Sequence, residues 1–166
     1  MTTRSGSGEY YPWVPDTSWT VLKPYWEGLA KGELLFPKCE HCGHFQWYPE
    51  PACDSCQSDR FKWTALEPRG TIYSYTVVRR SLLVGFEPPI IIALAAMDDA
   101  PNVRLLTNII DCSPDDISIG VSVDIARREV SPGVFLPFAR LFDPARLPAA
   151  GEKMAELISL CLPADL

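Results

Sequence analysis

The sequence predicts a mainly β protein in which a short helix and a small metal-binding module precede a five-stranded barrel. Two Cys-x2-Cys pairs lie close together in the first third of the 166-residue chain and indicate the metal module. Five runs rich in β-branched and aromatic residues follow, separated by Gly, Pro, Asn and Asp, and these indicate the barrel. A chain of this length forms one domain or two small ones.

Composition narrows the class of protein. A hydrophobic content of 47% is typical of a packed globule, and a net charge of −6 argues against a nucleic-acid-binding surface. No apolar run approaches the length that crosses a bilayer, and the first residues lack the apolar core of a signal peptide. We therefore expect a cytoplasmic protein with neither nucleic acid nor membrane as a partner.

Residues 1–33 are expected to form an aromatic arm followed by a short helix. The arm carries prolines, which hold the chain extended, and large rings that must be buried on this domain or on a partner: Tyr10, Tyr11, Pro12, Trp13, Pro15 and Trp19. A helix is predicted over residues 23–31, because Pro24 lies in its first turn and Gly32 follows its last residue.

Residues 34–66 form the predicted metal module. Each cysteine pair projects two thiolates from one tight turn, and two such turns facing one another complete a tetrahedral site from Cys39, Cys42, Cys53 and Cys56. Gly43 can take the positive φ that the first turn needs, whereas the second turn has Gln57 there and is expected to be slightly strained or differently turned. Short β-like runs are expected at residues 34–36, 45–48 and 61–63.

The metal is expected to be a structural zinc, with a rubredoxin-like iron centre as the alternative, since four thiolates suit both ions. Fewer than forty residues bury too little surface to fold unaided, so the metal supplies the missing stability. In a reducing compartment paired cysteines serve as ligands rather than as disulfides. Cys112 and Cys161 stand apart from the pairs and are expected to be small buried apolar residues.

Residues 67–142 are predicted to form a five-stranded barrel of the OB type. The expected strands are residues 71–78, 90–97, 103–110, 121–130 and 134–142, with turns at residues 98–102 and 113–116 and at Pro132-Gly133. An SH3-like barrel and an open meander remain alternatives on this pattern. Residues 143–166 are expected to form a tail with an amphipathic helix, whose apolar stripe is Met154, Leu157, Ile158 and Cys161.

We expect no catalytic centre in this chain. The only two histidines, His41 and His44, lie in the first cysteine turn and are expected to be exposed. No Gly-x-Ser-x-Gly motif or phosphate-binding glycine loop occurs, and a site closed by four thiolates leaves no position for substrate.

Arginine pairs beside apolar residues indicate a ligand or a partner. Arg79 and Arg80 precede an apolar loop that contains Phe86, and Arg127-Arg128 form a second pair. Such a surface suits a CoA thioester, which combines phosphate groups with an apolar acyl chain. Ordinary surface charge is the alternative interpretation of both pairs.

The order of motifs resembles the acyl-CoA-associated zinc-ribbon/OB-fold family known as domain of unknown function 35. The resemblance covers about residues 20–142 and rests on Pro24-Tyr25-Trp26-Glu27-Gly28-Leu29, the paired cysteines, Gly70-Thr71-Ile72-Tyr73-Ser74-Tyr75-Thr76-Val77, residues 104–110, residues 119–123 and Leu136-Pro137-Phe138. It is the combination of the cysteines with the Gly70 strand that makes the resemblance specific.

The resemblance implies a non-catalytic subunit bound to a thiolase-like catalytic subunit, which would be a thiolase, an acyltransferase or an aldolase of CoA thioesters in steroid or aromatic-acid degradation. Some members accompany hot-dog-fold hydratases. The small subunit completes the CoA site and stabilises the complex, and the four cysteines match the family's metal ligands. The alternatives are a single-stranded nucleic-acid-binding OB protein and an electron carrier with an iron-filled ribbon.

Overall fold

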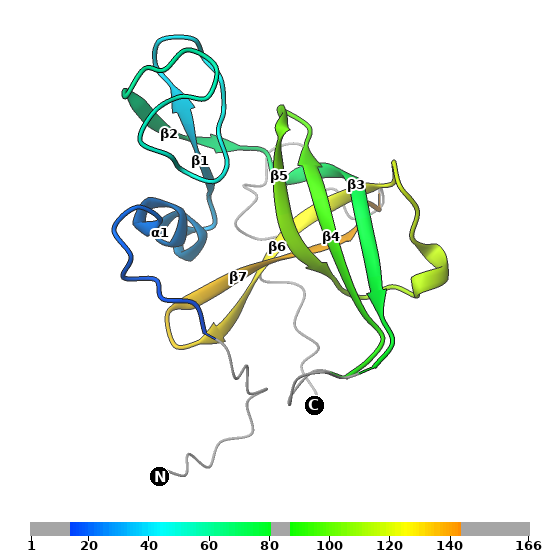
Figure 1. Ribbon diagram of the computed structural model, residues 1–166. Coiled ribbons are helices and arrows are strands. Elements are labelled where there is room, and N and C mark those ends of the chain that lie inside the picture. The colour runs from blue at the N-terminus through cyan, green and yellow to red at the C-terminus, as the bar shows by residue number, and fades with distance from the viewer. Residues whose placement is uncertain (1–13, 81–86, 144–166) are drawn as a thin grey trace, which may run out of the picture.

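The computed structural model describes residues 14–80 and 87–143. The arm before Val14, Phe86 of the predicted ligand loop and the predicted tail helix lie outside the described residues. Over the described ranges the chain is mainly β, with one α-helix ahead of a two-stranded ribbon and a five-stranded barrel (Figure 1). None of the described helices is long and apolar enough to cross a membrane.

The helix α1 (Lys23–Lys31) has the bounds that its flanking residues predict. Pro24 occupies the first turn, where its missing N–H leaves no hydrogen bond unmade. Gly32 ends the helix with φ of 85° and donates its N–H to the carbonyls of the last turn. The buried face consists of Tyr25, Gly28 and Leu29.

The ribbon is an antiparallel pair, β1 (Leu34–Cys39) and β2 (Phe61–Leu66), in which Cys39 lies opposite Phe61. The predicted strand at residues 45–48 is wrong, because only Phe45 forms a bridge, to Lys38. The Gln46 N–H still donates to Pro37 O at 3.0 Å, while the Gln46 side chain bonds to backbone groups of Ala52 and Asp54 near the second cysteine pair.

The barrel has the strands β3 (Arg69–Val78), β4 (Ile90–Met97), β5 (Ala100–Ile109), β6 (Ser122–Ser131) and β7 (Val134–Leu141), with a 3-10 turn at Pro114–Asp116. Its closed order is β3-β4-β5-β7-β6, all antiparallel except for the parallel pair β5·β7. This closed order confirms the OB-like barrel and excludes an open meander. The turn between β4 and β5 is shorter than predicted, since Met97 already pairs with Ala100 and the turn is Asp98-Asp99 alone.

Gly70 has a packing role at the start of β3, where the strand pairs with β4 and β6 at once. A Cβ atom at this position would lie 2.6 Å from the Ala96 carbonyl oxygen, which real side chains do not approach. The glycine at the start of β3 therefore permits the barrel to close.

One core runs through helix, ribbon and barrel. Phe36 of β1, Ile72 of β3 and Val103 of β5 are each at most 1% exposed and belong to the same cluster. Arg127 of β6 fastens the helix to the barrel, since its guanidinium donates to the carbonyls of Leu29, at 2.7 Å, and Ala30. A cation is favourable at a helix C-terminus. Arg127 therefore has a structural role, as a clasp between α1 and the barrel. This corrects the prediction that Arg127 is a surface charge or a ligand contact.

Candidate metal centre and aromatic groove

The four predicted ligands converge at the tip of the ribbon. Their sulfur atoms all lie within 4.8 Å of one another, and the distances from Cys39 to Cys56 and from Cys42 to Cys53 are both 3.6 Å. Zinc–sulfur bonds of about 2.3 Å place the sulfurs of a tetrahedron about 3.8 Å apart, whereas a disulfide would place two at about 2.05 Å. The four thiols are free, and their arrangement fits a tetrahedral metal ion.

The two cysteine turns have the same backbone structure. In the first, Cys39 N–H donates to His44 O at 2.8 Å and Gly43 N–H donates to Cys39 O at 2.9 Å. In the second, the matching bonds run from Cys53 to Ser58 O and from Gln57 to Cys53 O, at 2.8 and 2.9 Å.

Gly43 and Gln57 take φ of 75° and 61°, so the strain expected at Gln57 is present while the turn itself is unchanged. The Gln57 side-chain amide donates to Cys53 O at 3.1 Å, a contact that glycine could not make.

Electrostatics favour a cation between the turns. The backbone N–H of Cys42, aided by that of His41, lowers the pKa of the Cys39 thiol to about 6. The Ser58 N–H acts in the same direction on Cys56, but burial and the neighbouring thiols outweigh it and raise the pKa of Cys56 to about 12. Four thiolates cannot form side by side without a positive ion, and a divalent metal supplies that charge.

His44 belongs to the joint between ribbon and barrel. Its Nε2 lies 3.0 Å from Asp54 Oδ1 of the second turn and 3.3 Å from the Asn102 side-chain nitrogen of β5. Asn102 also donates to the Phe45 carbonyl. His44 is half-buried rather than exposed as predicted, whereas His41 is exposed.

Cys112 does not have the environment of a nucleophile. Burial raises the pKa of its thiol, and the carboxylates of Asp116 and Asp111 raise it further, so the reactive thiolate is disfavoured. Cys112 packs against the core but is only half-buried, whereas the sequence predicts a buried residue.

The loop between the cysteine turns links the metal centre to a groove. Gln46 is 5% exposed, and its amide spans the second turn, with Nε2 donating to Ala52 O at 3.2 Å and Oε1 accepting from Asp54 N–H at 2.9 Å. The next two residues, Trp47 and Tyr48, form part of the groove wall. The second cysteine turn therefore positions this wall.

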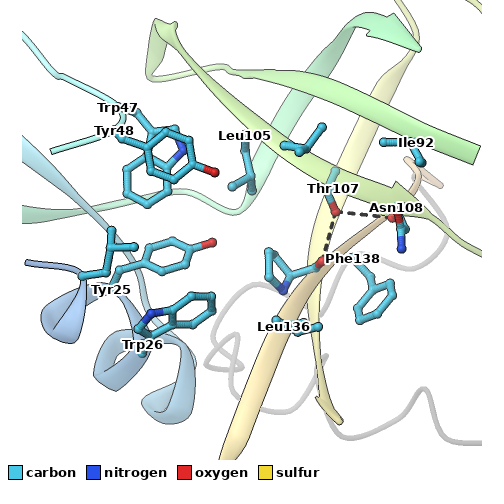
Figure 2. A pocket seen from close by; sticks show the side chains of 13 residues that line it. Tyr25, Trp26, Trp47, Tyr48, Ile92, Leu105, Thr107, Asn108, Leu136 and Phe138 are labelled. Atoms are coloured by element: carbon cyan, nitrogen blue, oxygen red, sulfur yellow. Dashed lines mark hydrogen bonds between the residues drawn. The ribbon is translucent and has the colours of Figure 1, made fainter. Parts of the chain in front are cut away.

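The groove has a volume of about 330 Å³ and lies where β5 and β7 diverge beside α1 (Figure 2). These two strands pair only at Asn108↔Phe138 and Ile109↔Ala139, which leaves the space between their other residues open. The lining is largely apolar and comes from all three parts of the fold: Leu22, Tyr25, Trp26, Trp47, Tyr48, Ile92, Leu105, Leu106, Thr107, Asn108, Leu136, Pro137 and Phe138.

Four aromatic rings form one side of the groove. Trp47 packs against Tyr25 at 4.8 Å and stacks on Tyr48 at 4.6 Å between ring centroids, and Trp26 meets Tyr25 edge-on at 5.0 Å. Figure 2 shows the hydroxyl ends of both tyrosines directed toward the barrel strands. Burial raises the pKa of Tyr25, with a smaller contribution from Tyr48, so this hydroxyl stays protonated.

Two hydrogen-bond donors in this cluster have no acceptor. The indole nitrogens of Trp26 and Trp47 are buried, and no acceptor in the described part of the chain reaches them. By contrast, the Thr107 hydroxyl in the same groove donates to Pro137 O at 3.1 Å. A buried donor left unpaired costs about 1–3 kcal/mol, so both indoles are unusual in a folded chain.

The predicted ligand-binding residues are not brought into this groove. Arg79 and Arg80 follow the last residue of β3 and are exposed, and the groove lining does not include them. Sequence reasoning missed the groove because Trp47 and Tyr48 fall in a run mistaken for a strand. The feature of the sequence that could have indicated the groove is a pair of adjacent aromatic residues in each of two separate segments, Tyr25-Trp26 and Trp47-Tyr48.

Comparison with known proteins places this fold in a family. The protein-family model described as "ChsH2, rubredoxin-like zinc ribbon domain" matches residues 26–62 of this chain. A second family model, "ChsH2, C-terminal OB-fold domain", matches residues 63–128. The two matches are contiguous and together span most of the described structure.

Curated relatives agree with these matches. A "DUF35 domain-containing scaffold protein" of Methanocaldococcus jannaschii is 28% identical over 100 residues, covering 58% of this chain and 69% of that protein. A "Probable enoyl-CoA hydratase alpha subunit" of Thermomonospora curvata is 32% identical over 118 residues, or 70% of this chain. The match spans only 36% of that relative's length, about a third.

Solved structures show the same fold. A chain of the "Ltp2-ChsH2(DUF35) aldolase" superposes with a TM-score of 0.68 at 28% identity, covering 74% of this chain and 94% of that one. A DUF35 protein of unknown function from Sulfolobus solfataricus superposes with a TM-score of 0.55 at 15% identity over 76% of this chain and 89% of its own, which concerns the fold alone. With the four-cysteine ribbon and the OB-like barrel, these matches show that the chain belongs to the ChsH2/DUF35 family of zinc-ribbon and OB-fold proteins.

Proposed function

We propose that this chain is a non-catalytic, zinc-binding subunit of a thiolase-type enzyme that acts on a bulky acyl-CoA, such as an aromatic or steroid side-chain thioester. The observation that carries the proposal is the likeness to the DUF35 chain of the Ltp2-ChsH2 aldolase, which this chain matches over 94% of that chain's length. The catalytic subunit would be a thiolase, an acyltransferase or a CoA-thioester aldolase, and a hot-dog-fold hydratase would be a further partner.

An exposed apolar surface on the barrel supports a protein partner. Tyr73 of β3 is 50% exposed and Leu106 of β5 is 55% exposed. Arg104, two residues before Leu106, lies over the Tyr73 ring at 3.8 Å. The Gly120 N–H bonds to Ile72 O, which brings the loop of the 69% exposed Ile119 next to Tyr73. We call these four residues, Tyr73, Arg104, Leu106 and Ile119, the barrel patch. Apolar residues with an arginine are typical of interface centres.

The CoA thioester is proposed as a ligand shared with the catalytic subunit. Arg79 and Arg80 are exposed at the end of β3, where they can reach the phosphates of a CoA held by a partner, and Phe86 would contact it from the loop that follows. In this assignment the small subunit completes the CoA site and supplies no group to the chemistry.

Zinc is proposed as the structural metal because four thiolates fit it and close its coordination. A thiolate site of this kind is suited to a reducing compartment, which is consistent with the cytoplasm. The ribbon would then serve as a rigid platform for assembly.

Co-expression with the thiolase-like protein encoded beside this chain tests the proposal. We expect a hetero-oligomer by size-exclusion chromatography with light scattering, and we expect Ile119→Asp to dissociate it by placing a charge in the barrel patch, at a residue outside the groove lining. Val21→Asp is the matched control, because Val21 is 47% exposed and is not one of the four residues of the barrel patch.

A chain that stays monomeric beside this thiolase-like protein would contradict the proposal. So would an assembly that tolerates Ile119→Asp and Tyr73→Asp as well as it tolerates the control, since the barrel patch would then have no part in it. The thermal midpoint of each variant, compared with that of the unsubstituted chain, shows whether the barrel is still folded.

A further inference from the structure

We propose that the aromatic groove is a docking site for the chain's own N-terminal arm, and that residues 10–13, Tyr-Tyr-Pro-Trp, are its occupant. This inference concerns the isolated chain and is independent of any catalytic partner. It begins from the groove between α1, the ribbon loop and the barrel. Trp26 and Trp47 line this groove, and their indole N–H groups are buried without an acceptor in the described structure.

The chemistry of the groove selects an extended, proline-containing peptide. Indole N–H groups only donate, so their partner must present acceptors, and the backbone carbonyls of an extended segment do so at regular intervals. Aromatic grooves recognise proline-rich segments because the ring faces pack on proline and the donors bond its neighbouring carbonyls. Pro12 itself brings no N–H that would be left unpaired on burial.

The arm also supplies the apolar surface that the groove can cover. Tyr10, Tyr11 and Trp13 carry large rings that an extended arm cannot bury against itself. The groove wall consists of rings on one side and aliphatic strand residues on the other, including Leu105 and Leu136. Both surfaces therefore lose exposed apolar area when the arm docks.

The length and starting point of the arm allow this docking. Leu22 lines the groove, and the described chain begins at Val14, only a short connection earlier. An extended chain covers about 3.3–3.6 Å per residue, so four residues span about 13 Å and the whole arm spans about 45 Å. The arm can therefore turn back to the groove within the same molecule.

The C-terminal segment is less well placed. It leaves the barrel after Phe142, whose N–H bonds to Ser122 O and whose ring lies 4.4 Å from the Arg69 guanidinium. This is the end of β7 away from the groove residues Leu136 and Phe138. Its sequence pattern is helical, whereas the unpaired indoles call for an extended acceptor strand.

Photo-crosslinking of the full chain tests the proposal. Tyr48 is 56% exposed at the groove and is replaced by p-benzoylphenylalanine, and a second protein carries the same group at Ile119, outside the groove. Equal amounts of ¹⁴N- and ¹⁵N-labelled protein are mixed, irradiated and digested for mass spectrometry. We expect position 48 to crosslink to residues 1–13 of the same molecule, with a yield independent of protein concentration, and position 119 not to do so.

The indole donors are tested by Trp26→Phe and Trp47→Phe, which keep an aromatic ring and remove the N–H. Loss of one hydrogen bond should lower the crosslink yield roughly three- to tenfold. Trp63→Phe is the control, because Trp63 is half-buried in the ribbon and is not part of the groove. Thermal midpoints of all three variants report whether the fold is kept.

The proposal is overturned by a crosslink from position 48 to residues 144–166, by crosslinks between isotopically different chains, or by no crosslink at all. The last result would assign the groove to a segment of another protein. Yields that stay the same in both indole variants, with the fold intact, would also overturn it, since the unpaired donors would then have no role.

Discussion

The ribbon and the barrel are stabilised by different interactions. The barrel closes five strands around residues such as Ile72, Val103 and Val123, each at most 1% exposed. The ribbon has two strands of six residues each and buries Phe36 together with two of its own metal ligands, Cys39 and Cys53. Where apolar burial is sufficient, side chains fill the interior, and where it is not, cysteines and an ion occupy that place. The ribbon should therefore unfold when a metal ligand is lost, and the barrel should lose stability when its apolar core is disrupted.

The largest expected effect is on the ribbon alone. Cys53→Ser removes a buried ligand, and because about 10–16 kcal/mol of metal-binding free energy is coupled to folding in such modules, residues 34–66 should lose both metal and structure. Metal per chain by mass spectrometry and amide hydrogen exchange measure the two losses, with the barrel amides still protected. Cys112→Ser, outside the cluster, should leave both unchanged; a Cys53→Ser chain with full metal and a protected ribbon would refute this dependence.

The converse experiment weakens the barrel. Ile72→Ala opens a cavity in the core of β3 and should lower the free energy of unfolding by about 2–5 kcal/mol, measured by urea denaturation. Metal content should stay the same, because the ligands lie in the other module. A variant that loses metal in proportion to its stability would show that the two parts fold as one unit.

A smaller effect is expected where Arg127 joins α1 to the barrel. Arg127→Met removes the charged donor that bonds the Leu29 and Ala30 carbonyls, and such bonds contribute about 1.5–3 kcal/mol. Faster hydrogen exchange in α1, with metal retained, is the expected result. Arg60→Met provides the control, since Arg60 is exposed in the ribbon. Equal exchange rates in both variants would remove Arg127 from this role.

The smallest effect compares the two cysteine turns. Gly43→Ala places a Cβ no closer than 3.8 Å to Lys38, so its penalty is the positive φ alone, about 1 kcal/mol, and zinc affinity should fall about fivefold. Gln57→Gly removes the same strain but also the bond to Cys53 O, and these terms should cancel to within about 0.5 kcal/mol. Competition with a chromophoric chelator measures both affinities. If Gln57→Gly lost as much zinc affinity as Gly43→Ala, the prediction would be wrong, because the Gln57 side-chain bond would then outweigh the strain of the positive φ.

The sequence was sufficient wherever the signal is local. Helix α1 is bounded by Pro24 and Gly32, and the metal ligands follow from cysteine spacing alone. The groove and the Arg127 clasp could not be predicted, because each joins residues far apart in the chain, as Arg127 and Leu29 show. Residues 45–48 were misread because an aromatic run has the same pattern whether it extends a ladder or faces a groove.

The hydrogen bonds of Gln46 across the second cysteine turn have a thermodynamic consequence. Trp47 and Tyr48 follow Gln46 directly, so a metal ion at the four cysteines and an occupant of the groove would stabilise the same conformation of one loop. Linkage of this kind is reciprocal. Metal binding raises the affinity of the groove for its occupant, and an occupied groove raises the affinity for the metal by the same factor. The equilibrium affinity for the metal, measured by competition with a chelator, therefore reports groove occupancy without a label on either ligand.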